Sequence, residues 1–155
     1  MKNSAKIANS LLTLALATGT CAVAAEHHVA CNTLPAAVQQ KSKPMLDGAT
    51  VHGCVQDVSK GKTTYEIESL KAGRSKDITF DADGNVLEIE EQVDMASLPG
   101  AVAAAIQKEA AGGQIGKVES ITRGGAVVSY ETTISRSGKR HEVAFHPDGS
   151  PMKAD

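Results

Sequence analysis

The chain has no tryptophan and only two tyrosines and two phenylalanines among its 155 residues. A hydrophobic core must therefore be built mainly from valine, isoleucine, leucine and alanine. A large excess of one charge is also missing, since the formal net charge is −2. Because the chain is not strongly basic and offers few aromatic rings for base stacking, its composition argues against nucleic-acid binding.

Recognisable catalytic and cofactor motifs are absent from the sequence. It contains no Gly-x-Ser-x-Gly, no His-Glu-x-x-His and no glycine-rich phosphate loop. Serine, histidine and aspartate all occur, but no spacing selects three of them as a triad. We therefore expect no catalytic residues and no cofactor, with a hydrolase that lacks a recognisable motif as a third alternative.

The long hydrophobic run of this chain lies at its N-terminus. Lys2 and Lys6 precede the apolar stretch 7–17, and small residues follow up to Ala25. This order is typical of a secretory signal peptide cleaved after Ala24 or Ala25, and the run is too short to span a bilayer. Cys21 lies in a poor lipobox, which disfavours lipidation. We expect residues 1–25 to be removed, which leaves a periplasmic or secreted chain without an integral membrane segment.

Two cysteines remain after this removal, Cys31 and Cys54. An even pair in an exported chain favours a disulfide. Cys31 precedes an expected helix and Cys54 lies in the strand that returns beside it, so the two sulfurs can meet near the start of the helix. A Cys-x-x-Cys motif is missing, which argues against a redox role, and metal binding through the thiols is the other alternative.

A duplicated pattern organises the rest of the chain. The matches are Leu34-Pro35 with Leu98-Pro99, Tyr65-Glu66 with Tyr130-Glu131, and Phe80 and Asp83-Gly84 with Phe145 and Asp148-Gly149. Their common order and nearly constant offset indicate two units of about 60 residues. We therefore divide the mature chain into an N-terminal tail at 26–33, a first repeat at 34–93 and a second repeat at 94–155.

Each unit begins with a helix and continues with strands. A proline suits the start of a helix, which predicts helices at about 35–46 and 99–111. Alternating apolar and polar residues after each helix predict an antiparallel meander of three or four strands. We expect an α+β fold of two tandem helix-plus-meander units, with the helices packed on one face of a sheet that the two units can share.

The stretch 80–85, Phe-Asp-Ala-Asp-Gly-Asn, looks like the start of a calcium loop. Its counterpart at 145–150, Phe-His-Pro-Asp-Gly-Ser, keeps only the phenylalanine, the aspartate and the glycine. These residues suit a hairpin turn, whereas calcium needs several oxygen ligands and a later bidentate glutamate. The comparison favours a turn and leaves calcium binding as the alternative. On the next strand, Glu88 and Glu90 are expected to share the solvent face.

This set of features resembles the PepSY-like family, whose tandem form resembles the β-lactamase-inhibitor protein (BLIP-like) fold. The leader peptide and the doubled Leu-Pro, Tyr-Glu and Phe-x-x-Asp-Gly motifs carry the resemblance over nearly all of the mature chain. It implies an exported, non-enzymatic domain that binds other proteins and, in related domains, inhibits or chaperones peptidases. The first strand region, with Gly53 and Cys54, departs from the second copy, so the two units need not be equivalent.

The expected partner is an envelope or extracellular protein, and a peptidase is one candidate. Tyr65 and Tyr130 are amphipathic candidates for the binding face, with packing in the core as the alternative. The turns at Asp83 and Asp148 can also contact a partner, as protruding hairpins do in inhibitors.

The residues Glu26-His27-His28 suggest a second function. Cleavage after Ala24 or Ala25 would place His27 or His28 third in the mature chain. A free amine, two backbone nitrogens and an imidazole at that position chelate Cu(II) or Ni(II) in a square plane. The alternatives for this segment are a periplasmic copper- or nickel-binding site and a flexible tail without a metal role.

Overall fold

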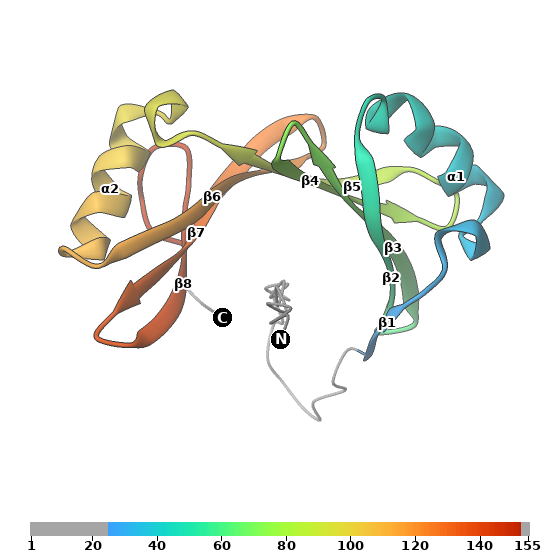
Figure 1. Ribbon diagram of the computed structural model, residues 1–155, viewed down its shortest axis with the longest axis horizontal. Coiled ribbons are helices and arrows are strands. Elements are labelled where there is room, and N and C mark those ends of the chain that lie inside the picture. The colour runs from blue at the N-terminus through green and yellow to red at the C-terminus, as the bar shows by residue number, and fades with distance from the viewer. Residues whose placement is uncertain (1–24, 153–155) are drawn as a thin grey trace, which may run out of the picture.

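The computed structural model describes residues 25–152, and one eight-stranded antiparallel sheet makes up most of it (Figure 1). The strand order follows the chain from β1 to β8, so each strand pairs with its neighbours in sequence. The strands are β1 (Ala25–His28), β2 (Thr50–Ser59), β3 (Lys62–Lys71), β4 (Arg74–Asp81), β5 (Val86–Val93), β6 (Gln114–Arg123), β7 (Ala126–Arg136) and β8 (Lys139–Phe145).

The expected fold class, α+β with two tandem helix-plus-meander units, is wrong. Strand β5 pairs with β6 from Ile89 opposite Thr122 to Val93 opposite Val118, directly before the expected boundary between the units. Backbone hydrogen bonds therefore join all the strands into a single sheet, and the helices are a small part of the molecule. Residue periodicity locates each strand, but it does not tell which strands pair, because any two strands with matching faces satisfy the same pattern.

Both helices are shorter than the sequence predicts. Helix α1 (Ala36–Ser42) has seven residues and is followed by the 3-10 turn η2 (Lys43–Leu46), which contains Pro44. A proline has no backbone N–H, so the α-helical hydrogen-bond pattern does not continue through it. Helix α2 (Gly100–Ala110) ends at Ala111, which adopts a left-handed conformation. Two further 3-10 turns, η1 (Cys31–Thr33) and η3 (Met95–Ser97), precede the two helices.

Two hydrophobic clusters lie near opposite ends of the sheet. In the first, Val38 of α1 meets Ile78 and Phe80, and all three side chains are fully buried. In the second, Val102 and Ile106 of α2 meet Val118 and Phe145, among others. Figure 1 shows the sheet as an arch, with α1 and α2 on its outer side at opposite ends. The inner side of the arch is therefore a sheet surface that neither helix covers.

The calcium-loop-like stretch forms a tight turn between β4 and β5. The carboxylate of Asp81 accepts hydrogen bonds from the backbone nitrogens of Asp83, at 3.0 Å, and Asn85, at 2.8 Å. Gly84 has a positive φ of 73°, and a Cβ atom there would lie 2.8 Å from the carbonyl oxygen of Ala37 in α1. The turn therefore needs a glycine both for its conformation and for its close approach to the helix.

The matching turn after β8 has the same arrangement. Gly149 has a φ of 82°, and a Cβ atom there would lie 2.7 Å from the carbonyl oxygen of Ala101 in α2. The glycine shared by the two stretches thus lets each turn lie against the first turn of a helix. The duplication that the sequence suggests stays a prediction, but this contact explains why a glycine occurs in both places.

Candidate functional site

The register of the strands defines the inner face of the arch. Successive residues of a strand point to opposite faces, and directly paired residues point to the same face. Ile67, Ile78 and Ile89 are paired in a row across three strands and lie in or against the first hydrophobic cluster. The residues directly before and after each of them on its own strand therefore point to the opposite side. We call this side the concave face; over β3–β7 it carries Glu66, Glu68, Asp77, Thr79, Glu88, Glu90, Gln92, Glu119, Ile121, Ser129 and Glu131.

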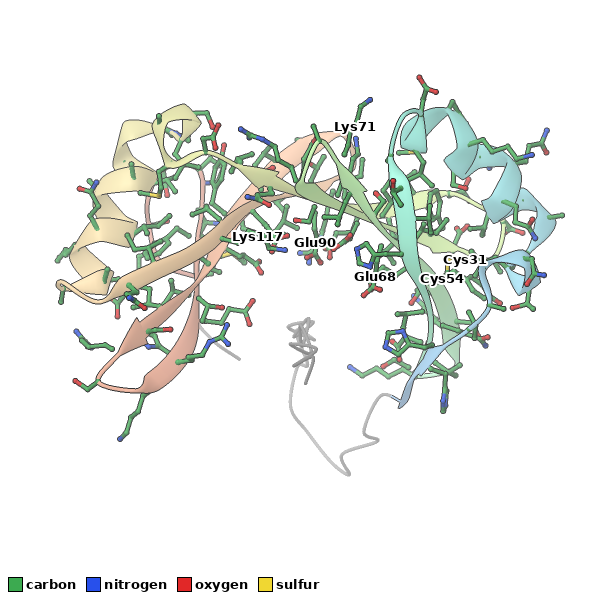
Figure 2. The ribbon with its side chains drawn as sticks, viewed as in Figure 1. Cys31, Cys54, Glu68, Lys71, Glu90 and Lys117 are labelled. Carbon is green, nitrogen blue, oxygen red and sulfur yellow. A yellow bond between two sulfur atoms is a disulfide. The ribbon has the colours of Figure 1, made fainter. Side chains whose placement is uncertain are left out.

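Carboxyl groups dominate the concave face. One row across the sheet pairs Glu68 with Asp77 and Asp77 with Glu90. Further along, Glu119 on β6 pairs with Glu131 on β7. Like charges placed directly opposite each other repel, so this arrangement works against the stability of the sheet. Figure 2 shows Glu68 and Glu90 on the inner side of the arch.

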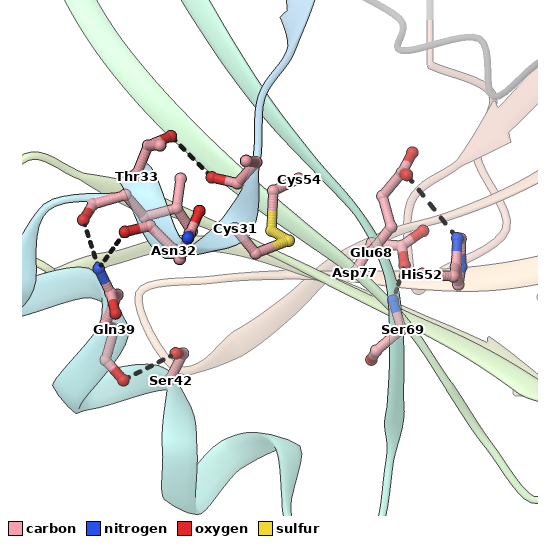
Figure 3. Close-up of a disulfide and its surroundings, with 12 residues drawn as sticks. Cys31, Asn32, Thr33, Gln39, Ser42, His52, Cys54, Glu68, Ser69 and Asp77 are labelled. Carbon is pink, nitrogen blue, oxygen red and sulfur yellow. Dashed lines mark hydrogen bonds and ion pairs between the residues drawn. A yellow bond between two sulfur atoms is a disulfide. The ribbon is translucent and has the colours of Figure 1, made fainter.

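Lys117, Arg123 and His52 each contact a carboxyl group of the concave face. Lys117 places its Nζ 2.7 Å from Oε1 of Glu119 and donates a hydrogen bond to Oγ of Ser75. Arg123 contacts Glu88 through its Nε atom. His52 lies 3.8 Å from Glu68 and contributes a charge only when its imidazole is protonated (Figure 3). The charge of Lys117 also acts on Asp77, where it opposes the larger effect of burial on the pKa of that carboxyl group.

Glu90 occupies the centre of this cluster. Its burial, and then the negative charges of Glu88, Glu66 and Glu119, raise its pKa to about 9. A hydrogen bond with the side chain of Glu88 acts in the same direction. Glu90 therefore holds a proton at neutral pH, because a further negative charge at this place would be poorly solvated and close to other carboxylates.

Neighbouring carboxyl groups shift in the same direction. Burial raises the pKa of Asp77, whose side chain is only 4% exposed, although the backbone N–H of Ser69 donates to it at 3.1 Å. Burial also raises the pKa of Glu131 on β7 and of Glu142 on β8. The sequence correctly predicts that Glu88 and Glu90 share a face of the sheet. It also predicts that this face is fully solvated, and this is wrong because both side chains are partly buried.

The predicted disulfide is present. Cys31 in η1 and Cys54 in β2 are bonded, with their Cα atoms 5.4 Å apart (Figure 3). Cys54 is 2% exposed and belongs to the first hydrophobic cluster, on the side of the sheet that faces α1. The bond thus fastens the chain before α1 to the sheet and leaves the concave face free.

The residues suggested for partner binding lie elsewhere. Tyr65 packs against the first hydrophobic cluster and Tyr130 against the second, so both point to the outer side. Asp83 lies in the exposed turn beside α1, and Asp148 accepts hydrogen bonds from the backbone and hydroxyl of Ser150 in its own turn. None of the four reaches the concave face, and a binding role for them stays a prediction.

The two N-terminal histidines lie in β1. His27 pairs with Gln56 and His28 with Val55 of β2, so the segment that could be a flexible tail is an edge strand. Their imidazoles point to opposite faces of the sheet, because they are successive residues of a strand. Within residues 25–152, no group of three or more histidine, cysteine, aspartate or glutamate side chains is arranged to hold a metal ion.

The signal peptide and Cys21 fall, apart from Ala25, outside the described residues. Over the part of the chain that the structure describes, no helix has the length and hydrophobicity needed to cross a membrane.

Several solved structures share this fold. A protein from Bacteroides eggerthii that is inferred to be periplasmic superposes with a TM-score of 0.63 at 18% identity, over 77% of this chain and 86% of that protein. A BLIP-like protein from Bacteroides fragilis gives a TM-score of 0.57 at 23% identity, over 78% of this chain and 85% of that one. A DUF2874 family protein from Bacteroides uniformis gives 0.61 at 20% identity, over 77% and 86% of the two chains.

These likenesses show that the chain has a BLIP-like fold. No family model and no curated protein matches the sequence, so membership of the PepSY-like family stays a prediction. The sequence alone does not single out the concave face as a site. A signal for it exists, since acidic residues repeat every second position at 66 and 68 and at 88 and 90, but the opposing strands that bring them together are set by the fold.

Proposed function

We propose that this chain is an exported, non-enzymatic protein-binding module that uses the concave face of its sheet. The observation that carries this proposal is the concave face itself. It is a curved sheet surface that neither helix covers (Figure 1). It is lined by partly buried carboxyl groups whose negative charges disfavour the ionisation of their neighbours. Side chains that destabilise the free protein in this way are better explained by contact with a partner than by the stability of the fold.

The dimensions of the face suit a macromolecule. From β3 to β7 it spans four strand spacings, or roughly 19 Å at about 4.8 Å each. A typical stable protein interface buries about 800 Å² on each partner, an area of comparable width. The surface is broad and open, whereas sites for small molecules are usually concave pockets with mainly apolar walls.

The shared fold and the leader-like N-terminus support the proposal that the chain is exported to the periplasm or secreted. The neighbour from Bacteroides eggerthii is inferred to be periplasmic, and the disulfide between Cys31 and Cys54 suits an oxidising compartment. The BLIP-like neighbour supports a role in binding another protein. The finer form of the proposal is a peptidase inhibitor or a chaperone-like protein of the envelope.

The test is affinity capture with the oxidised chain 26–155 from an extract of the exported proteins of the source organism. Thr79 lies on the concave face between Glu66 and Glu88, whereas Gln107 lies on the exposed surface of α2. A partner that is lost with Thr79→Trp and retained with Gln107→Trp would support the proposal. Equal capture by the two variants would contradict use of the concave face.

A captured peptidase then separates inhibition from simple binding. An inhibitor lowers the turnover of the peptidase at a one-to-one ratio and is not itself cleaved. A chaperone-like protein leaves turnover unchanged and instead protects the peptidase from heat inactivation.

A further inference from the structure

We propose that β8 is a self-association surface through which two copies of this chain pair edge to edge, so that their sheets join into one. The pairing is antiparallel and two-fold, and it is centred on His141. Arg140 of each copy then lies directly opposite Glu142 of the other copy. This inference goes beyond the proposed function and does not depend on it, because it uses the edge of the sheet at β8.

The outer edge of β8 already pairs with a short piece of chain at one end. Among the described strands, β8 comes last in the sheet and pairs with β7. On the side away from β7, Pro151 forms a bridge with Phe145, and the backbone N–H of Met152 donates to the carbonyl oxygen of Ala144 at 2.9 Å. The backbone groups of Ala144 therefore point away from β7, and this edge of the strand is able to accept backbone hydrogen bonds.

Further along β8, backbone groups on the same side of the strand have no partner. Residues of an antiparallel strand direct their N–H and C=O groups alternately toward one neighbouring strand and the other. Since those of Ala144 point away from β7, those of Glu142 and Arg140 do so too. Within residues 25–152, no backbone group forms a hydrogen bond with either residue from this side. The edge therefore offers two N–H and two C=O groups to a further strand.

These free groups select one two-fold register. Centring the pair on Arg140 sets this residue opposite itself and sets Glu142 opposite Gly138, which lies in the turn before β8. Centring it on Glu142 sets that residue opposite itself and sets Arg140 opposite Ala144, whose carbonyl oxygen is already bonded. Centring on His141 instead joins Arg140 to Glu142 twice as hydrogen-bonded pairs, so it uses all the free groups of both edges.

The side chains are complementary in this register. Arg140 and Glu142 are two residues apart, so they share a face of β8, and within residues 25–152 neither of them forms an ion pair. In the two-fold pair each arginine lies opposite a glutamate, at a Cβ separation of about 5 Å that favours opposite charges. On the other face His141 lies opposite itself and Lys139 opposite Val143, so two lysines, two arginines or two acids never face each other.

A second copy fits this edge better than an unrelated strand. Charged residues on an edge strand usually deter pairing, because most strands offer no matching charge. Here the stretch 139–143, Lys-Arg-His-Glu-Val, carries both the arginine and the acid that matches it, so it is complementary to itself. A two-fold pair of this kind closes after two copies, because both copies use the same edge. It therefore produces a dimer and not a fibre.

The experiment is sedimentation equilibrium of the oxidised chain 26–155. The pairing stretch 139–143 is about 17 Å long, which is short for an interface, so we expect a weak dimer. Concentrations up to about 1 mM are needed to measure its dissociation constant. Arg140→Glu sets acid against acid and Glu142→Arg sets arginine against arginine, so each variant alone should raise the dissociation constant about tenfold or more.

Complementary charges can then be restored in two ways. In an equimolar mixture of Arg140→Glu and Glu142→Arg, both pairs join an acid to an arginine, so a mixed dimer should form. The double variant Arg140→Glu/Glu142→Arg restores both pairs and has the net charge of the wild type, so it should dimerise as the wild-type chain does. The matched control is Lys60→Glu, in the exposed turn between β2 and β3, which changes the net charge as Arg140→Glu does and should leave the dimer unaffected.

Disulfide crosslinking tests the register independently. The two-fold axis brings the two Cα atoms of residue 141 to about 4.5 Å, which is within the range of a disulfide. His141→Cys should therefore form a crosslinked dimer on oxidation, whereas Gln107→Cys, on the exposed surface of α2, should not.

Three results would overturn the inference. The first is a wild-type chain that stays monomeric at about 1 mM. The second is a dimer that Arg140→Glu and Lys60→Glu weaken equally, or that neither the mixture nor the double variant restores, because such a dimer uses another surface. The third is equal crosslinking of His141→Cys and Gln107→Cys, which would show random collision and not a defined register.

Discussion

Asp77 on β4 and Glu90 on β5 are directly paired across the sheet, and both carboxyl groups have a raised pKa. Paired acids of this kind cannot both ionise without cost, because each lies in the field of the other and is partly removed from water. The pair sits in the middle of a face that neither helix covers. Ionisation of this pair therefore changes both the stability of the free protein and the charge of the surface that we propose for binding.

The stability of the protein should fall as the pH rises. Glu90 has a pKa of about 9 in the folded chain against an ordinary value of 4.5, so the folded state holds the proton more tightly. Its stabilising contribution is complete below pH 4.5 and is lost as the pH rises toward 9. Glu90→Gln removes this loss, so it should raise the free energy of unfolding at pH 8 by roughly 1–3 kcal/mol and change it little at pH 4.5.

Urea unfolding at these two pH values, with Glu91→Gln as the control, checks this prediction. Glu91 is exposed and forms an ion pair with Lys76 at 3.9 Å, so its substitution should change stability by less than about 1 kcal/mol at either pH. A Glu90→Gln variant that is equally destabilised at both pH values would contradict a protonated Glu90.

The turn between β4 and β5 should depend on its glycine through two separate effects. Gly84→Ala places a Cβ in a left-handed conformation and also 2.8 Å from the carbonyl oxygen of Ala37. Gly73→Ala meets the conformational cost alone, because Gly73 has a φ of 80° and nothing within 4 Å of the added Cβ. We expect about 1 kcal/mol of destabilisation at Gly73 and at least about 1 kcal/mol more at Gly84. Equal melting temperatures for the two variants would rule out the contact with α1.

The disulfide should stabilise the first half of the sheet. Cys31 and Cys54 are 23 residues apart in sequence, and closing a loop of that size stabilises a protein by about 3 kcal/mol. Reduction, or Cys31→Ser/Cys54→Ser, should therefore lower the free energy of unfolding by about this amount. Thermal unfolding with and without reductant measures the change, and an unaltered transition would show that the bond does not constrain the chain.

Copper should not stabilise the folded protein. A square-planar chelate needs two consecutive backbone nitrogens, whereas β1 holds its backbone extended against β2. A ligand that binds only after β1 leaves the sheet cannot raise the melting temperature as a ligand of the native state does. We expect Cu(II) to leave the melting temperature of the chain 26–155 unchanged or to lower it. A saturable increase that disappears with His27→Ala/His28→Ala would instead establish the metal-binding alternative.

Local features of the fold could be predicted from the sequence. The disulfide, the starts of the two helices and the turns at Asp83-Gly84 and Asp148-Gly149 each depend on a few residues near one another in the chain. Prolines at the helix starts and glycines with positive φ leave little conformational choice, so the pattern is informative there.

The concave face could not be predicted in the same way. The alternation of Glu88 and Glu90 shows that they share a face, but not that Asp77, Glu66 and Glu119 lie beside them. That neighbourhood depends on the pairing of β5 with both β4 and β6. The sequence predicts a boundary between two units near residue 93, and such a boundary gives no reason to expect that β5 pairs with β6. The partial burial of these acids is likewise a property of the assembled sheet.

The most direct test of the central claim is site-specific photo-crosslinking in the source organism. A benzoylphenylalanine would replace Thr79 on the concave face and, in a second strain, Gln107 on the exposed surface of α2. We predict that the probe in place of Thr79 yields one discrete protein adduct, which the probe in place of Gln107 does not form. Adducts from Gln107 alone, or the same adducts from both positions, would contradict the assignment of the concave face as the protein-binding surface.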